Sequence, residues 1–226
     1  MLLSVTLKTI PMPQATAILL NFNATNEEAS KNNNKNFFDA AAFLFSQLPE
    51  LEKNAGGYTY ILPNPEAQPV PDLSHNESSS DGGNATEKFT SPMLFLWTGT
   101  VLDAPVEKVY EIFGPTITKL KQMQGVDTLF IAYPGGTWYE RWVTSDPEGG
   151  VGSNVQLTSR LWDAKAVSDQ KSVAKTLSLL GNDGFQGLVV SGPGVHAYGA
   201  ESSPVTPAWR KAVVHTRMSL SVNSGG

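Results

Sequence analysis

Two ionisable side chains near the C-terminus have a spacing that suits ligand binding. His215 and Arg217 lie two residues apart in a run that alternates from Lys211 to Val222. Side chains alternate between the two faces of a strand, so both would project from the same side, roughly 6.5–7 Å apart. An imidazole exchanges protons near neutral pH, and a guanidinium holds negative charge. The run predicts either a ligand-facing floor or a solvated strand face.

Two further stretches carry residue types that suit binding. Trp138, Tyr139 and Glu140 lie in GGTWYERW (135–142), and aromatic clusters of this kind can line a sugar or aromatic-ligand pocket. A half-buried strand with an ion pair is the alternative for this stretch. Arg160 follows a glycine-rich turn in GVGSNVQLTSRLW (150–162), where it would anchor an anionic group or pair with a carboxylate.

Self-contained catalytic sets are absent from the sequence. The remaining histidines, His75 and His196, show no metal-ligand spacing with other residues, so we expect no metal site. The stretch SGPGVH (191–196) has glycines without a following helix pattern and predicts a turn between strands. With no cysteine in the chain, thiolate nucleophiles and disulfides within it are excluded.

The composition describes a globular chain with a substantial core. Its 226 residues suit one large domain or two small ones, and 40% of them are hydrophobic. A net charge of −5 without basic clusters argues against a nucleic-acid partner. The apolar runs 15–22 and 93–97 are strand-length, so we expect no membrane span. Glycosylation sequons begin at Asn23, Asn76 and Asn84.

The pattern of apolar residues predicts strands and helices in alternation. We expect strands over 15–22, 58–62, 93–102, 126–133, 185–191 and 211–222, and helices over 35–48, 106–124 and 170–180, the second kinked or split at Gly114-Pro115. The run from Asn32 to Asn34 offers caps for the first helix. These β-α-β units predict an α+β fold, an antiparallel sheet with helices packed on one face and a polar face left free.

The order of these features resembles a known family. SVTLKTIP (4–11) is similar to the end of the flavin domain in fungal berberine-bridge-enzyme-like oxidases, which are FAD-linked oxidoreductases of the vanillyl-alcohol-oxidase (PCMH) type. The segment GVGSN…SRL resembles a motif in the middle of their substrate domain. TPAWRKAVVH (206–215) resembles their Asn-Pro-Ala-Trp-Arg corner, with Thr206 in place of Asn. The resemblance runs from residue 4 to about 222.

The resemblance implies a domain map and a cofactor. Residues 1–13 would be the remnant of a flavin-domain strand and linker, and 14–226 the substrate domain, with a flexible insertion at about 64–89. The family's preceding flavin domain, which tethers FAD through a His and a Cys, has no counterpart here. We therefore expect a fragment or truncated relative that binds no FAD by itself and depends on a flavin domain on a separate or missing segment.

The resemblance also implies a function, and it adds to the candidate site residues that the residue patterns suggest. The parent activity is FAD-dependent oxidation of an alcohol, a sugar or a secondary metabolite. His215 and Arg217 are the candidate catalytic groups, and the candidate substrate-binding groups are Trp138, Tyr139, Glu140, Arg160, His196 and Tyr198. The alternatives are a cofactor-free pocket or binding protein, such as a helper of a biosynthetic cyclisation, and an inert gene fragment. The family is commonly secreted, whereas this N-terminus has no signal-peptide pattern, which leaves the location undetermined or cytoplasmic.

Overall fold

A seven-stranded antiparallel sheet is the framework of the protein. The computed structural model describes residue 9 and residues 11–64, 70–71, 89–144, 155–179, 184–189, 192–199 and 205–221. The sheet has the strand order β6-β1-β5-β2-β8-β9-β7. Its strands are β1 (Gln14–Ala24), β2 (Ala55–Pro63), β5 (Met93–Leu102), β6 (Val126–Thr137), β7 (Val155–Asp163), β8 (Phe185–Val189) and β9 (Ala212–Ser221).

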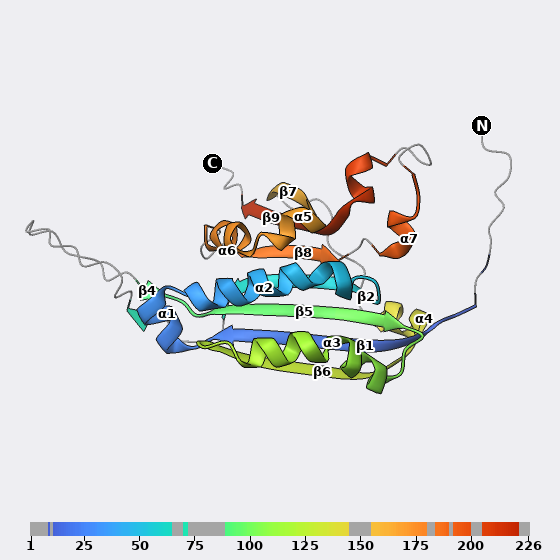
Figure 1. Ribbon diagram of the computed structural model, residues 1–226, viewed down its shortest axis with the longest axis horizontal. Helices are drawn as coiled ribbons and strands as arrows, with labels where there is room; N and C mark the ends of the chain where they lie inside the picture. Colours follow the sequence, from blue (N-terminus) through green and yellow to red (C-terminus); the bar gives the residue numbers. More distant parts are fainter. Residues whose placement is uncertain are drawn as a thin grey trace, which may run out of the picture.

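Helices cover one face of this sheet. The long helices α2 (Lys35–Leu51) and α3 (Val106–Lys121) and the shorter α5 (Ala164–Ser168) and α6 (Gln170–Ser178) contribute buried side chains to the core. The other helices are α1 (Asn26–Asn32), α4 (Trp138–Thr144), α7 (Pro193–His196) and the 3₁₀ helix η3 (Pro207–Arg210). The two long helices α2 and α3 lie across the same side of the sheet (Figure 1). The predicted α+β class, an antiparallel sheet with helices on one face, is confirmed.

The first half of the chain follows a β-α-β-β-α-β order. β1 and β2 both pair antiparallel with β5, which lies between them, and β6 pairs with the outer side of β1. This arrangement is the ferredoxin-like one, in which two crossover helices pack on the same face. The second half adds β8, β9 and β7 beyond β2, so that β6 and β7 form the two edges of the sheet.

The core lies between the sheet and the helix layer. Alternate residues of β1 and β5 are buried, among them Phe22 and Phe95. The rings of these two residues stack with their centroids 4.6 Å apart. Trp97 packs edge-on against Phe113 of α3, with ring centroids 5.6 Å apart. Burial of large side chains such as these stabilises the fold by about 1.5–3 kcal/mol each. Packing against this core holds the strands in place, and with them the side chains on the opposite face of the sheet.

The junction of α1 and α2 depends on a buried carboxylate. Glu28, 2% exposed, accepts hydrogen bonds from the backbone N–H of Asn36 (2.6 Å) and from the side-chain amides of Asn32 and Asn36 (2.8 Å each). Asn34 occupies the N-cap position of α2, but its side chain makes no capping hydrogen bond. An asparagine therefore stands at the predicted cap position, but the Glu28 carboxylate, and not the Asn34 side chain, satisfies an N–H group of the first turn.

Several other predictions need correction. Residues 138–144 form the helix α4 rather than a half-buried strand, because Thr137 and Glu140 form a capping box at its start: Glu140 Oε2 accepts from Thr137 N (2.7 Å) and Oγ1 (2.9 Å). α3 runs through Gly114 and Pro115 as one helix. The end of the SGPGVH stretch, expected as a turn, contains the short helix α7.

The predicted flexible insertion falls mostly outside the described residues. Within it, the structure describes only Asn64, the two-residue strand β3 (Val70–Pro71) and Phe89, with which β4 (Phe89–Thr90) begins, and the two short strands pair antiparallel. The predictions for 1–13 likewise fall largely outside the described part of the chain. Within the described residues, no helix combines the length and hydropathy needed to cross a membrane.

Candidate functional site

The face of the sheet opposite the helices, here called the open face, is largely apolar. The register aligns Leu94 and Leu96 of β5 with polar Asn23 and Asn21 of β1, and continues to Leu129 of β6. Large hydrophobic side chains of this face are 38–59% exposed: Tyr58, Leu62, Leu102, Leu129, Ile131, Tyr133 and Leu157. The predicted polar face is therefore wrong for most of the sheet, because β5 and β6 carry apolar residues at the outward positions as well.

Polar side chains gather at one region of the open face, on β2, β8 and β9. The register places Arg217 opposite Gln186, and Gln186 opposite Tyr60. Arg217 Nε donates to Gln186 Oε1, and Gln186 Nε2 donates to the Tyr60 hydroxyl at 3.0 Å. We call Arg217, Gln186 and Tyr60 the polar ladder. It holds a guanidinium, an amide and a phenol in one line across three strands.

His215 lies beside the polar ladder. The register places His215 between Leu161 of β7 and Leu188 of β8. The ring of Trp209, from η3, meets the imidazole edge-on with centroids 5.2 Å apart. Burial lowers the pKa of His215, and the positive charge of Arg217 lowers it further. The imidazole is thus favoured in its neutral form, which can accept a proton. His215 and Arg217 share the open face, as their spacing predicts.

Arg160 lies on the other side of the sheet. Its register with Thr216 places it on the helix-facing side of the edge strand β7, where it is exposed. It lines a cavity of about 340 Å³ beneath α6, together with Trp162, Leu177, Phe185 and Met218. The sheet therefore separates the Arg160 side chain from His215.

Trp138, Tyr139 and Glu140 lie together on α4, which contacts β1 and β6 at the far edge of the sheet from β9. Trp138 and Tyr139 are exposed, and Glu140 forms the capping box with Thr137. Hydrogen bonds from Thr137 lower the pKa of Glu140. The structure thus brings these three residues together but separates them from His215 by several strands.

His196 and Tyr198 lie in and just after α7. The ring of His196 bridges Glu52 and the backbone carbonyl of Arg210, whereas Tyr198 is 63% exposed. Among the sequon asparagines, Asn23 is half-buried in β1, and Asn76 and Asn84 lie outside the described residues. Their glycosylation remains a prediction. Within the described residues no cluster of three metal-ligating side chains occurs.

Comparison with known proteins identifies the fold. No protein-family model and no curated protein matches the chain. Among solved structures, the VAO-type flavoprotein MtVAO713 from Myceliophthora thermophila C1 aligns with a TM-score of 0.69 and 22% identity over 95% of this chain. This is the fold of one part of the VAO-type flavoproteins.

Other solved structures agree with that assignment. MtVAO615 from the same organism aligns with a TM-score of 0.63 and 17% identity, and a variant of berberine bridge enzyme with 0.56 and 12%. Each covers 95% of this chain. This chain in turn spans 36%, 34% and 38% of the MtVAO713, MtVAO615 and berberine bridge enzyme chains, so it corresponds to about a third of those proteins. The fold expected from the resemblance is confirmed.

Sequence reasoning missed the partners of Arg217 on the open face. Gln186 and Tyr60 belong to strands 126 residues apart in the sequence, and only the pairing of β2 with β8 brings them together. One local signal was present, since Tyr58 and Tyr60 have the two-residue spacing that places both on the same face of a strand.

Proposed function

We propose that this chain is the substrate-covering domain of an FAD-dependent oxidoreductase of the berberine-bridge-enzyme type. The observation that carries the proposal is the open face, which is broad, apolar and interrupted by the polar ladder and His215. A monomeric protein rarely leaves so many large apolar side chains contiguous on its surface. In this proposal the open face lies over the ring of FAD and over the substrate, and the remaining two thirds of a VAO-type flavoprotein would supply the rest of the FAD site.

The described residues suit one half of FAD. Tyr58, Leu188 and Tyr60 offer flat apolar surface against which a ring system can pack, and Arg217 can hold negative charge. The open face offers no glycine-lined helix start among its described residues to hold a pyrophosphate. When bound, FAD supplies the hydride acceptor. The chain by itself is expected to stay colourless after incubation with FAD and gel filtration.

Each polar group of the open face has a proposed task. His215, kept neutral at physiological pH, takes the proton from a substrate hydroxyl. Arg217, oriented by Gln186, binds an acidic group of the substrate, and Tyr60 donates a hydrogen bond at the other end of the ladder. The apolar strands on either side favour a flat, largely hydrophobic alcohol or secondary metabolite as the substrate.

A chimera tests this function. This chain would replace the matching third of MtVAO713, and the flavin content and turnover of the chimera would be measured. We expect His215→Ala and Arg217→Ala each to lower kcat/KM of the chimera by a factor of about 10²–10³, with the flavin content unchanged. If both variants keep the turnover and the substrate affinity of the unmutated chimera, the open face is not a substrate ceiling, and a cofactor-free binding protein becomes the better explanation.

A further inference from the structure

A carboxyl group is buried where α2 ends, on the helix side of the molecule. The side chain of Glu52 is 6% exposed, and its Oε1 lies 2.9 Å from Nε2 of His196 in α7. Its Oε2 is buried and has no hydrogen-bond partner within the described residues. Burial raises the pKa of Glu52, while the hydrogen bond and charge of His196, and the charge of Lys53, lower it. A buried carboxyl persists only when a partner compensates for its lost hydration.

His196 links this carboxyl group to η3. Its Nδ1 lies 2.7 Å from the backbone carbonyl oxygen of Arg210. A carbonyl oxygen only accepts, so Nδ1 carries a hydrogen atom. Nε2 faces a carboxyl oxygen, and that contact requires one more proton, located on Nε2 or on Glu52. Glu52 and His196 therefore share this second proton, and together they tie the end of α2 to the last residue of η3.

The same short helix reaches the open face. Trp209 directly precedes Arg210 in η3, and its ring contacts His215 edge-on at 5.2 Å. One end of this contact chain is thus the buried Glu52, and the other is the imidazole on the open face. Because the Trp209 ring excludes water from one side of His215, its position contributes to the burial that lowers the pKa of His215.

We propose that Glu52 and His196 are positioning residues for His215, because they hold η3 where Trp209 shields the His215 ring. This inference rests on the proposed function, which gives His215 its task. Neither residue touches the open face, and both act through the backbone of η3. The same arrangement explains the Pro-Ala-Trp-Arg corner, whose tryptophan packs on one histidine while its arginine carbonyl binds another.

One of the charged groups near this contact chain, Glu50, provides a matched control. Lys53 is the cation beside Glu52, and it also forms an ion pair of 2.6 Å with Glu50. Arg210 belongs to η3 itself, and Arg217 is the cation beside His215. The Glu50 side chain is 77% exposed and lies two residues before Glu52 in the chain. Glu50→Ala therefore removes a carboxylate from the same helix end without touching His196.

A pH titration followed by NMR of the histidine imidazoles tests the proposal. We expect Glu52→Ala to release η3 and raise the titration midpoint of His215, as its ring becomes hydrated. Glu52→Gln keeps a side-chain amide that can donate to Nε2. It should leave the His215 midpoint unchanged and lower the His196 midpoint, because the negative charge is gone. Glu50→Ala should change neither midpoint.

Two further variants make the result decisive. Trp209→Leu removes the shield directly at a half-buried position and should raise the His215 midpoint as Glu52→Ala does. His196→Ala replaces Glu52→Ala if the latter does not fold. An unchanged His215 midpoint in Trp209→Leu, or in a folded Glu52→Ala or His196→Ala, overturns the proposal. The titration needs neither flavin nor substrate, so its failure is distinguishable from failure of the chimera.

Discussion

At the scale of single residues, the electrostatics of the open face centre on His215. Burial and Arg217 lower its pKa below the ordinary 6.5, so the folded chain binds this proton less readily than the unfolded chain. The free energy of unfolding should then decrease as the pH falls through about 6.5 and reach its lower limit below the folded pKa. A neutral imidazole at physiological pH is also what a proton acceptor for a hydroxyl group requires.

Replacement of Arg217 tests this account of His215. We expect Arg217→Gln to raise the pKa of His215, because the second cause of its lowering is removed and burial remains. The loss of stability on acidification should become smaller in this variant. NMR titration, with urea unfolding at about pH 5 and pH 7.5, would measure both effects. Lys211→Gln, at an exposed position just before β9, is the control, and an equal shift in both variants would contradict a specific effect of Arg217.

At the scale of elements, the junction between α1 and α2 depends on Glu28. Its carboxylate accepts three hydrogen bonds and holds the first turn of α2, where Asn34 provides no side-chain cap. We expect Glu28→Ala to lower the free energy of unfolding by about 2–3 kcal/mol, because the N–H of Asn36 loses its partner in a part-buried site. Urea denaturation would measure the change.

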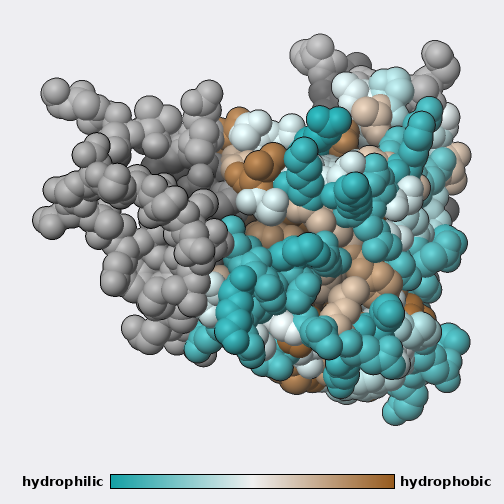
Figure 2. Space-filling view, turned by 60° about the vertical axis from the view of Figure 1, so that its left-hand side comes forward, coloured by the Kyte–Doolittle hydropathy of each residue, from teal (hydrophilic) through white to brown (hydrophobic). Residues whose placement is uncertain are grey.

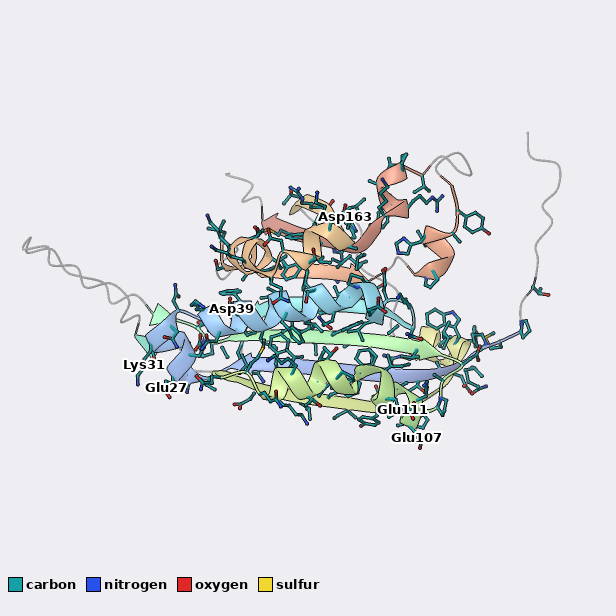
Figure 3. All side chains as sticks on the ribbon, viewed as in Figure 1. Glu27, Lys31, Asp39, Glu107, Glu111 and Asp163 are labelled. Atoms are coloured by element: carbon teal, nitrogen blue, oxygen red, sulfur yellow. The ribbon has the colours of Figure 1, made fainter. Side chains whose placement is uncertain are left out.

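The neighbouring Glu27 is the matched control for this prediction. It lies on α1 and forms an exposed ion pair of 2.9 Å with Lys31 (Figure 3). Exposed pairs of this kind contribute little to stability, so Glu27→Ala should leave the unfolding curve nearly unchanged. Similar small effects of both substitutions would show that Glu28 does not hold the junction.

The helices and strands were largely predictable from the sequence, whereas the pairing of strands distant in sequence was not. The apolar run that begins at Met93 predicted β5 at the bounds that the structure shows, and the predicted helices over 35–48, 106–124 and 170–180 correspond to α2, α3 and α6. The two-residue spacing of His215 and Arg217 placed both on one face. Tyr60 and Gln186 join them only through long-range strand pairing, which leaves no local pattern. The α4 stretch was misread as a possible strand, since its capping box stands among aromatic residues that also favour strands.

At the scale of the whole molecule, the two faces of the sheet differ in how they meet solvent. One face is covered by helices, and exposed ion pairs lie on α1, α2 and α3. Among the residues that are coloured in Figure 2, hydrophilic ones predominate, with hydrophobic ones between them. Among the described residues, the open face instead exposes seven large hydrophobic side chains distributed over β2, β5, β6 and β7. At roughly 25 cal/mol per Å² of apolar surface, covering such a face is strongly favourable. The isolated chain is therefore expected to bury the open face against another protein surface.

This imbalance predicts self-association of the isolated chain. Sedimentation velocity should show a concentration-dependent shift to larger species, and the double substitution Leu129→Lys with Ile131→Lys on the edge strand β6 should reduce it. Both side chains are partly exposed, so circular dichroism should show an unchanged fold. Leu179→Lys is the control, because Leu179 is 76% exposed but lies at the end of α6, on the helix side. Two outcomes would contradict this prediction: a chain that stays monomeric at about 100 μM, or a control variant that reduces self-association equally well. Either would show that the open face does not drive association, and the proposed contact with a flavin domain would lose its physical basis.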